Sequence, residues 1–483
     1  MTFDSLDFLI FFAVIYSVWF FLRAADRKIR NSFLLLASYF FYGYWSPQFV
    51  LLLMTSTLVD FYLGRAIHKS DNDRTRKQLV GVSVAVNLSI LGFFKYFNFF
   101  VDTAVMMLPE GSFMAPALKV ILPVGISFYT FQSMSYSIDV YRGNIKPSDS
   151  LIDFALYVAF FPQLVAGPIE RAGNMLPQFA TTPRVAVGRT LDGLDLCIRG
   201  FFKKVVIADN VAPLVNMVYG DVDAASSQAL WIGTYAFAIQ IYADFSAYTD
   251  IARGSAKLLG FELMENFRSP YRSLNFTELW QRWHISLSTW FRDYLYRPLV
   301  SGGRRSRTVQ LRSLFIVMAL AGLWHGAAWN FVLWGLFHGL LLVLHSGLRP
   351  TLFRVTSGCN AITKAAYRTL AWFVTFHMII ISFVMFRAEA VADIGIALDK
   401  MLFGLPAALS TSGLNYIPNA GPGEQLFYVV IIIGMLAMQF SNLEERWKWA
   451  SNVMVRGTRG AVTLAMLALL YPTVKEQFIY FQF

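Results

Sequence analysis

Long apolar segments recur along the whole chain, and they constrain its fold more than any other feature. A helix that crosses a bilayer needs about 20 predominantly apolar residues. Hydrophobic residues make up 56% of the 483 positions and charged residues 15%, which is too little polar surface for a soluble globular protein. No polar stretch is long enough for a separate soluble domain. We therefore predict an all-α polytopic membrane protein, with one integral membrane domain over residues 1–483 and about 11–13 spans plus re-entrant and amphipathic interfacial helices.

The distribution of charge predicts the orientation of this domain. The formal net charge is +11, but the basic residues lie in loops between apolar segments and are not gathered on one face, so a nucleic-acid partner is not expected. Basic loops follow the first and third apolar segments, and the turn between those loops carries no charge. Because cytoplasmic loops are enriched in lysine and arginine, we expect the N-terminus on the side of the membrane away from the cytoplasm. The first eight residues contain no basic residue, which favours a first span over a cleaved signal peptide.

The segment 275–290 predicts an amphipathic helix. Asn275, followed three residues later by Glu278, is a plausible capped start, and Pro298 is a plausible end. His284 falls on the border of the two helix faces, roughly 80° from the centre of the apolar stripe. At about 100° per residue, that stripe consists of Phe276, Leu279, Trp280, Trp283, Leu287, Trp290 and Tyr294.

A second motif, Gly-Leu-Trp-His-Gly-Ala-Ala-Trp-Asn at residues 322–330, places a histidine inside a membrane helix. The segment 311–328 is almost wholly apolar and carries His325 between two glycines. Counting from Arg312 at the expected cytosolic edge, thirteen residues at 1.5 Å each place His325 about 20 Å deep in a hydrocarbon core about 30 Å thick. A histidine at that depth is a functional candidate, since polar residues in the bilayer are costly.

Both motifs resemble the membrane-bound O-acyltransferase family, and in particular its bacterial branch that acetylates exported polysaccharides such as alginate. The segments 122–132 and 160–171 and the last six residues also resemble that branch. Because basic residues flank 160–171 on both sides, we predict that this segment is a re-entrant turn that forms a pocket wall. The resemblance implies a helical ring that encloses a tunnel, with His325 as the catalytic histidine and His284 as its companion. It also implies that an acetyl group passes from cytosolic acetyl-CoA across the inner membrane to an exported, alginate-like polysaccharide. A periplasmic SGNH-type acetyltransferase or polymer-acetylation complex would take the group onward. Acetyl-CoA would be a substrate, and we expect neither a bound cofactor nor a metal.

Further residues are candidates for support or substrate binding. Trp324 and Asn330 can orient the imidazole or bind the thioester oxygen, and Arg282 and Trp283 are further candidates for substrate binding. Arginines around the Ser301-Gly302-Gly303 loop suit the phosphates of coenzyme A, although a cytosolic loop would be basic without any ligand. These arginines include Arg304 and Arg305.

Several alternatives remain open at this stage. His325 can act as a general base or form a covalent acyl-imidazole; it can also be a hydrogen-bonded core histidine. Asp244, inside an apolar segment, can be functional or can brace a neighbouring helix. His338 and His345 are seven residues apart, about 10 Å along a helix, so they are too far apart to share a metal ion and fit helix packing or hydrogen-bond donation.

The overall function also has alternatives. The acyl group can be D-alanyl or another group bound for a cell-envelope polymer. Intramembrane charges and broken helices would also serve a transporter or flippase. No inverted repeat is visible in the sequence, and transport does not explain a deep histidine beside tryptophan.

Overall fold

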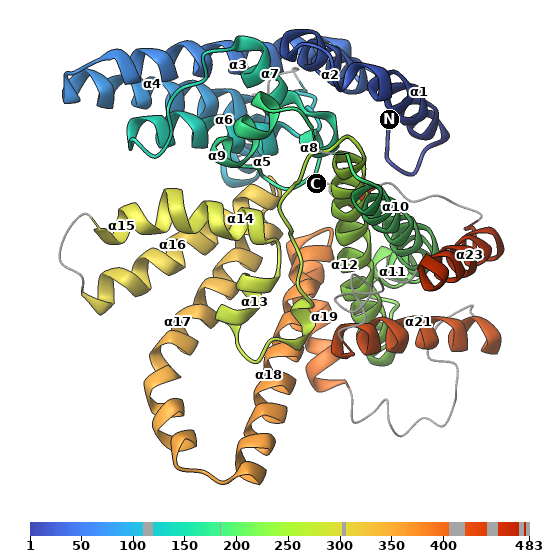
Figure 1. Cartoon of the computed structure of the whole chain (residues 1–483). Coiled ribbons are helices and arrows are strands. Elements are labelled where there is room, and N and C mark those ends of the chain that lie inside the picture. Colours follow the sequence, from blue (N-terminus) through green and yellow to red (C-terminus); the bar gives the residue numbers. More distant parts are fainter. Residues whose placement is uncertain are drawn as a thin grey trace. The chain divides into compact units, whose positions relative to one another are not determined.

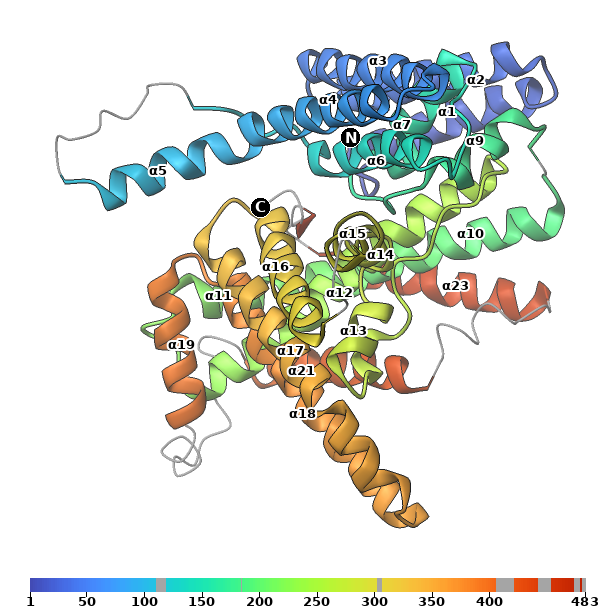
Figure 2. The ribbon, with the colours of Figure 1, turned by 90° about the vertical axis from the view of Figure 1, so that its left-hand side faces the viewer.

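The regular structure of this chain is entirely helical wherever the computed structural model describes it, which is residues 1–109, 119–183, 185–301, 306–404, 421–441, 453–472 and 478–479 (Figures 1 and 2). In this part of the chain, six helices are long and apolar enough to cross a membrane. The prediction of an all-α polytopic membrane protein is confirmed, while the predicted number of about 11–13 spans stays a prediction. The six are Pro47–Lys69, Asp73–Met107, Arg307–His325, Trp329–Ser357, Ala361–Arg387 and Gly423–Phe440.

The chain forms two compact units. One consists of residues 1–200 and 248–265, and the other of residues 201–247 and 266–483. The long helix α12 (Ser227–Leu258) contributes residues to both units. The single domain predicted over residues 1–483 stays a prediction.

In the first unit, α3 (Pro47–Lys69), α4 (Asp73–Leu91) and α6 (Ile126–Tyr141) lie side by side (Figures 1 and 2). Asp60 on α3 is fully buried between them. Its carboxylate accepts hydrogen bonds from side chains of α4 and α6, which satisfies a charged group that would otherwise be costly inside a membrane. The donors are Ser83, Asn87, Ser133 and Ser137.

The segment 160–171, predicted to be a re-entrant turn, is broken and buried. It follows α7 (Leu151–Ala159), contains only the four-residue helix α8 (Phe161–Leu164), and is fully buried up to Glu170. Gly125 packs directly against it, with φ of 77° and no room for a side chain, since a Cβ would lie 2.6 Å from the carbonyl oxygen of Leu164. Irregular backbone enclosed by protein is what a membrane environment requires. A role as pocket wall stays a prediction.

In the second unit, α16 (Arg307–His325) and α17 (Trp329–Ser357) form an antiparallel hairpin, and α17 also packs against α18 (Ala361–Arg387) (Figures 1 and 2). Two glycines bring the backbones of the hairpin into contact. A Cβ on Gly322 would lie 2.2 Å from the carbonyl oxygen of Phe331, and one on Gly335 would lie 2.4 Å from that of Met318. His325, the last residue of α16, is therefore held close to α17.

The helix predicted across His284 is interrupted. Asn275 caps it as expected, because its side chain accepts a 2.9 Å hydrogen bond from the backbone N–H of Glu278. However, α13 (Phe276–Arg282) ends before His284, and α14 (Ile285–Trp290) begins after it. The predicted end at Pro298 is also wrong, since a π-helical turn leads into α15 (Arg297–Ser301), which contains Pro298.

Asp244 on α12 has the bracing role that the sequence left open. Its carboxylate lies 3.1 Å from the Lys204 ammonium and accepts a 2.7 Å hydrogen bond from the backbone N–H of Ile479. It thereby links α12 to the helical turn at residues 202–208 and to the described end of the chain. The remaining helices are α1 (Leu6–Leu22), α2 (Arg27–Gly43), α5 (Phe97–Met107), α9 (Ala172–Ala180), α10 (Val187–Phe201), α11 (Asp209–Gly220), α19 (Val391–Phe403), α21 (Pro422–Phe440) and α23 (Val453–Leu469).

Candidate active site

His325 is enclosed by aromatic rings contributed by three helices. Its side chain is buried, with 4% of its surface exposed. The centre of its imidazole lies 5.1 Å from that of the Trp324 ring, 4.9 Å from Trp334 on α17, and 5.4 Å from Phe386 on α18. This enclosure excludes bulk water, which strengthens every polar interaction that a substrate would make with the imidazole.

His284 is the second buried histidine of the site, and the helix break places it there. Its ring centre lies 6.2 Å from that of His325 and 5.7 Å from that of Trp324. Burial lowers the pKa of His284 to about 3, so its imidazole is neutral at physiological pH. The structure therefore places the two histidines that the sequence singled out side by side. His284 reaches this position at a break between two helices, and not on the face of one continuous helix as the periodicity predicted.

The backbone of His284 adopts the left-handed conformation, with φ of 43°, which is unfavourable for a residue with a Cβ. Asn266, itself fully buried, stabilises the break. Its backbone carbonyl accepts a 3.0 Å hydrogen bond from the N–H of Ile285, and its side-chain oxygen accepts a 3.1 Å bond from the N–H of Ser286. Asn266 lies outside both sequence motifs, so sequence reasoning missed it.

The other predicted site residues have different positions. Trp324 lies beside both histidines. Asn330 donates a 3.0 Å hydrogen bond to the backbone carbonyl of Ala388, which ties the start of α17 to the end of α18. That bond is structural. Arg304 and Arg305 lie outside the described residues.

A small cavity lies directly beside His325. Its volume is about 20 Å³. We call it the histidine cavity, and its walls include a second histidine, His338 of α17, whose Nε2 lies 3.0 Å from the Ser382 hydroxyl. The full lining is Ile241, Leu279, Trp280, Trp283, His325, Trp334, His338, Ile379, Phe383 and Phe386. Trp283, a predicted substrate-binding residue, is thus in the wall.

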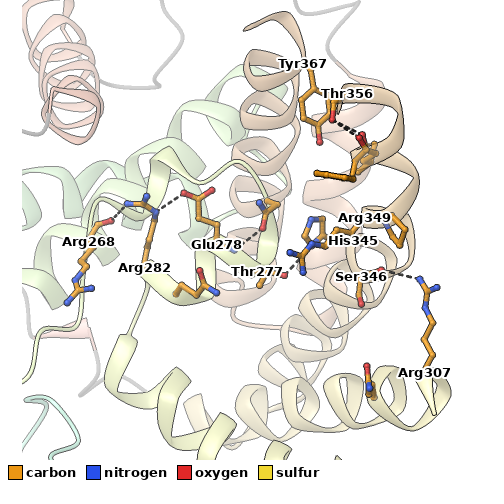
Figure 3. Close-up of a pocket in the computed structure, with 16 residues that line it drawn as sticks. Arg268, Thr277, Glu278, Arg282, Arg307, His345, Ser346, Arg349, Thr356 and Tyr367 are labelled. Carbon is orange, nitrogen blue, oxygen red and sulfur yellow. Dashed lines mark hydrogen bonds and ion pairs between the residues drawn. The ribbon is translucent and has the colours of Figure 1, made fainter. Parts of the chain in front are cut away.

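A much larger basic cavity also has residues of α13 and α17 in its wall, together with residues of α16 and α18. Its volume is about 1260 Å³, and we call it the basic vestibule (Figure 3). Arg282, a predicted substrate-binding residue, lies in its wall and pairs with Glu278 at 2.9 Å. Figure 3 shows these two side chains across the vestibule from His345 and Arg349 of α17. Four arginines and one glutamate give the wall a net positive charge; the residues are Arg268, Asn275, Thr277, Glu278, Gln281, Arg282, Arg307, Gln310, His345, Ser346, Arg349, Pro350, Leu352, Phe353, Thr356 and Tyr367.

The two cavities follow one another along α17. His338 lines the histidine cavity and His345 lines the vestibule, which places them about 10 Å apart along the helix axis. The pattern was visible in the sequence, because Trp334, His338, His345 and Arg349 recur at helical spacing on one face. In the described part of the chain, no group of His, Cys, Asp and Glu side chains is arranged to hold a metal ion.

Comparisons with known proteins match this chain to acyltransferases. Residues 40–387 match the model of the membrane-bound O-acyltransferase family. The chain is 40% identical over 392 residues to the probable alginate O-acetylase AlgI of Pseudomonas aeruginosa, covering 80% of this chain and 72% of that protein. It is 31% identical over 507 residues to a peptidoglycan O-acetyltransferase of Helicobacter pylori, with 95% and 93% covered. It is 27% identical over 285 residues to a teichoic acid D-alanyltransferase of Bacillus subtilis, with 57% and 71% covered.

Proposed function

Because this chain belongs to the membrane-bound O-acyltransferase family, we propose that it passes an acetyl group from cytosolic acetyl-CoA across the inner membrane for O-acetylation of an exported, alginate-like polysaccharide. It is a multi-pass membrane O-acyltransferase. The names of its relatives support the acetyl group, since the alginate relative is named a probable O-acetylase and the peptidoglycan relative an O-acetyltransferase. The role assigned to each residue below belongs to the proposal.

One observation carries the donor assignment: a basic vestibule and a cavity containing His325 lie in succession on α13 and α17. Coenzyme A has its phosphates at one end of a slender arm and its thioester at the other. Arginine side chains bind phosphate oxygens through paired hydrogen bonds. The vestibule therefore suits the phosphates, and the aromatic enclosure suits the thioester.

In the proposed reaction, His325 is the general base that activates an acceptor hydroxyl for attack on the thioester. A neutral imidazole accepts the hydroxyl proton as the oxygen bonds to the carbonyl carbon. The carbon–sulfur bond then breaks, and the proton passes to the departing thiolate, which leaves an acetyl ester and a free thiol. The alternative is a covalent acyl-imidazole at His325, which the hydroxyl attacks in a second step. Acid quenching during turnover, followed by mass spectrometry, distinguishes them, because only the second route leaves acetyl on the protein.

His284 is suited to support this reaction while uncharged. Its low pKa keeps it neutral, so it adds no positive charge that would disfavour proton uptake by His325. Trp324 packs against both imidazoles, with ring centres 5.7 Å from His284 and 5.1 Å from His325, and so restricts how the two rings can move.

The donor assignment is tested with purified protein in lipid nanodiscs and labelled acetyl-CoA. We expect release of the free thiol together with hydrolysis or transfer of the acetyl group. Intact acetyl-CoA after prolonged incubation with active, folded protein would contradict the proposal. Movement of an unmodified solute across proteoliposomes, without thioester cleavage, would favour a transporter instead. Labelled D-alanyl thioester in the same assay tests the second acyl group, which the B. subtilis relative suggests.

The acceptor polymer is tested in cells. Deletion of the gene should remove O-acetyl groups from one purified envelope polymer, as measured by nuclear magnetic resonance. We expect that polymer to be an exported alginate-like polysaccharide. Loss from peptidoglycan alone would instead favour the activity named for the H. pylori relative, which matches this chain over a greater length at lower identity.

We also propose a periplasmic acetyltransferase of the SGNH type as partner, docking near the segment 387–425, of which residues 405–420 lie outside the described residues. Because His325 is enclosed, an extended serine side chain of a partner protein can reach it more readily than a bulky sugar chain can. Reconstitution with acetyl-CoA on one side and polymer on the other tests this. Efficient polymer acetylation without a second protein would reject the relay.

The proposed orientation, with a periplasmic N-terminus, is tested by labelling. A cysteine at Asn72 should be protected from impermeant thiol reagents in intact cells, whereas one at Ser112, outside the described residues, should be labelled. The reverse pattern would overturn the proposed direction of transfer.

A further inference from the structure

The histidine cavity contains polar groups that the proposed reaction at His325 does not use. Three ring nitrogens on its walls are buried and have no hydrogen-bond partner among the described residues. They are Nε1 of Trp280, Nε1 of Trp334 and Nδ1 of His338. Leaving a buried polar group without a hydrogen bond is costly, so three such groups on one cavity point to a ligand that bonds them.

The hydrogen bonds around His338 decide what its Nδ1 can do. The hydroxyl of Ser382 donates its single proton to the carbonyl oxygen of Ile379, at 2.7 Å. It therefore accepts at its other contact, which requires His338 Nε2 to carry a proton and donate it over 3.0 Å. In the neutral ring, Nδ1 is then an acceptor. The indole N–H groups of Trp280 and Trp334 are donors only.

An amide group matches this arrangement, because it offers one N–H donor and one carbonyl acceptor. The position along the helix also matches. Trp334 contacts His325, and His338 follows one turn later, about 6 Å further toward the vestibule. In coenzyme A, only two carbons and the sulfur separate an amide nitrogen from the acyl carbon. When the thioester is at His325 and the phosphates are in the vestibule, that amide falls beside His338.

We propose that His338, Trp280 and Trp334 form a binding site for the amide nearest the thioester of the donor. This inference rests on the proposed acetyl-CoA donor. The amide N–H donates to His338 Nδ1, and its carbonyl accepts from the indoles. The cavity volume of about 20 Å³ is room for one water, which needs roughly 10–15 Å³. An amide offers the same kinds of hydrogen bond as such a water, and because it is larger, the cavity walls must adjust to admit it.

The test compares two short donors with purified wild-type protein in nanodiscs. S-acetyl-N-acetylcysteamine carries the thioester and the amide, whereas S-butyl thioacetate carries the thioester and a plain hydrocarbon. We expect wild-type kcat/KM, measured as thiol release by mass spectrometry, to be about tenfold or more higher for the amide donor. His338→Phe keeps a ring of similar size without the acceptor, and should reduce the ratio to near one. Ser382→Ala removes the hydroxyl that fixes the proton on His338 Nε2, and should reduce the ratio in part.

Two controls separate this site from the vestibule. His345→Phe, on the same helix face, should leave the ratio between the short donors unchanged. Arg349→Gln should weaken use of acetyl-CoA but not of the short donors, which carry no phosphate. No discrimination by the wild type, or discrimination that persists in His338→Phe, would overturn the inference while acetyl-CoA is still used. Failure of all three donors would overturn the proposed function, and the inference with it.

Discussion

The histidine cavity and the basic vestibule share residues of α13 and α17 in their walls, yet they differ in volume and in the charge of their linings. One has a volume of about 20 Å³ and aromatic walls; the other has about 1260 Å³ and four arginines. Along α17 the change takes place within the seven residues from His338 to His345. A single helix can therefore serve both a reaction and a binding step, because its successive turns meet different neighbours.

In the proposed reaction, the vestibule contributes mainly to affinity and the histidine cavity mainly to catalysis. Charges in the open vestibule are screened by water and salt, so each contributes modestly and mainly to binding. Polar groups in the enclosed cavity act in a low dielectric, so few are needed for large effects on rate. Substitutions in the two regions should therefore change different kinetic constants.

Loss of His325 should have the largest effect. We expect His325→Ala to lower kcat by more than about 100-fold, because a proton acceptor at the reacting carbonyl is typically worth 10²–10⁴-fold. The protein should stay folded, since a removed imidazole leaves a cavity but no stranded charge. Acetyl release in nanodiscs measures activity, and circular dichroism serves as the folding control. Activity near the wild-type level would refute the catalytic assignment.

Acidification should destabilise the enclosed site through His284. Its pKa is lowered from 6.5 to about 3 in the folded protein, so below pH 6.5 the unfolded chain binds a proton that the folded one excludes. Stability is therefore lost as pH falls, by roughly 2 kcal/mol between pH 7.5 and pH 5. Thermal unfolding in detergent measures this, and His284→Gln, which cannot titrate, is the comparison. If the stability of the wild type and of His284→Gln depended equally on pH, the folded protein would not keep His284 unprotonated.

Loss of one arginine in the vestibule should have a smaller effect, confined to binding. We expect Arg349→Gln to raise KM for acetyl-CoA about tenfold, or ~1.4 kcal/mol, with kcat almost unchanged. Arg354→Gln is the matched control, because Arg354 is exposed on the same helix and does not line the vestibule. A fall in kcat of the same size would mean that the arginine acts on the reaction, and the contrast between the two cavities would fail.

The smallest effect concerns the backbone at the helix break. Because His284 has a positive φ, we expect His284→Gly to be more stable than His284→Ala by about 1 kcal/mol. Both variants lack the imidazole, so their activities should be equally low. Thermal unfolding of the two variants side by side gives the difference. Equal stability would indicate that the break relaxes when the side chain is removed.

The sequence predicted the membrane class, the two candidate histidines and the cap at Asn275, because each depends on local pattern. It did not predict the break at Trp283 and His284, since the apolar period continues through it without a glycine or proline. What breaks the helix is tertiary: Asn266, twenty residues before Ser286, bonds the backbone on the far side of the break. Periodicity carries no information about such a partner.

His338 shows the opposite case. Its helical spacing from Trp334 and His345 was present in the sequence, but the sequence suggested only helix packing or hydrogen-bond donation for it. His338 lines the same cavity as His325 because of how α16, α17 and α18 pack together. The pattern of a single helix cannot predict that packing. Arg282, a predicted substrate-binding residue, lies in the vestibule wall, and its substrate-binding role stays a prediction; Arg268, from a segment before α13, was not among the candidates.

The glycine contact between α16 and α17 limits how this chain can diverge in evolution. Side chains on the cavity walls can be exchanged without moving the backbone, so single substitutions can alter the donor. At Gly322 and Gly335 even a methyl group meets a backbone carbonyl within 2.4 Å, so the helices separate and His325 moves with them. In a library of random variants selected for activity, both codons should stay glycine while the surrounding walls vary.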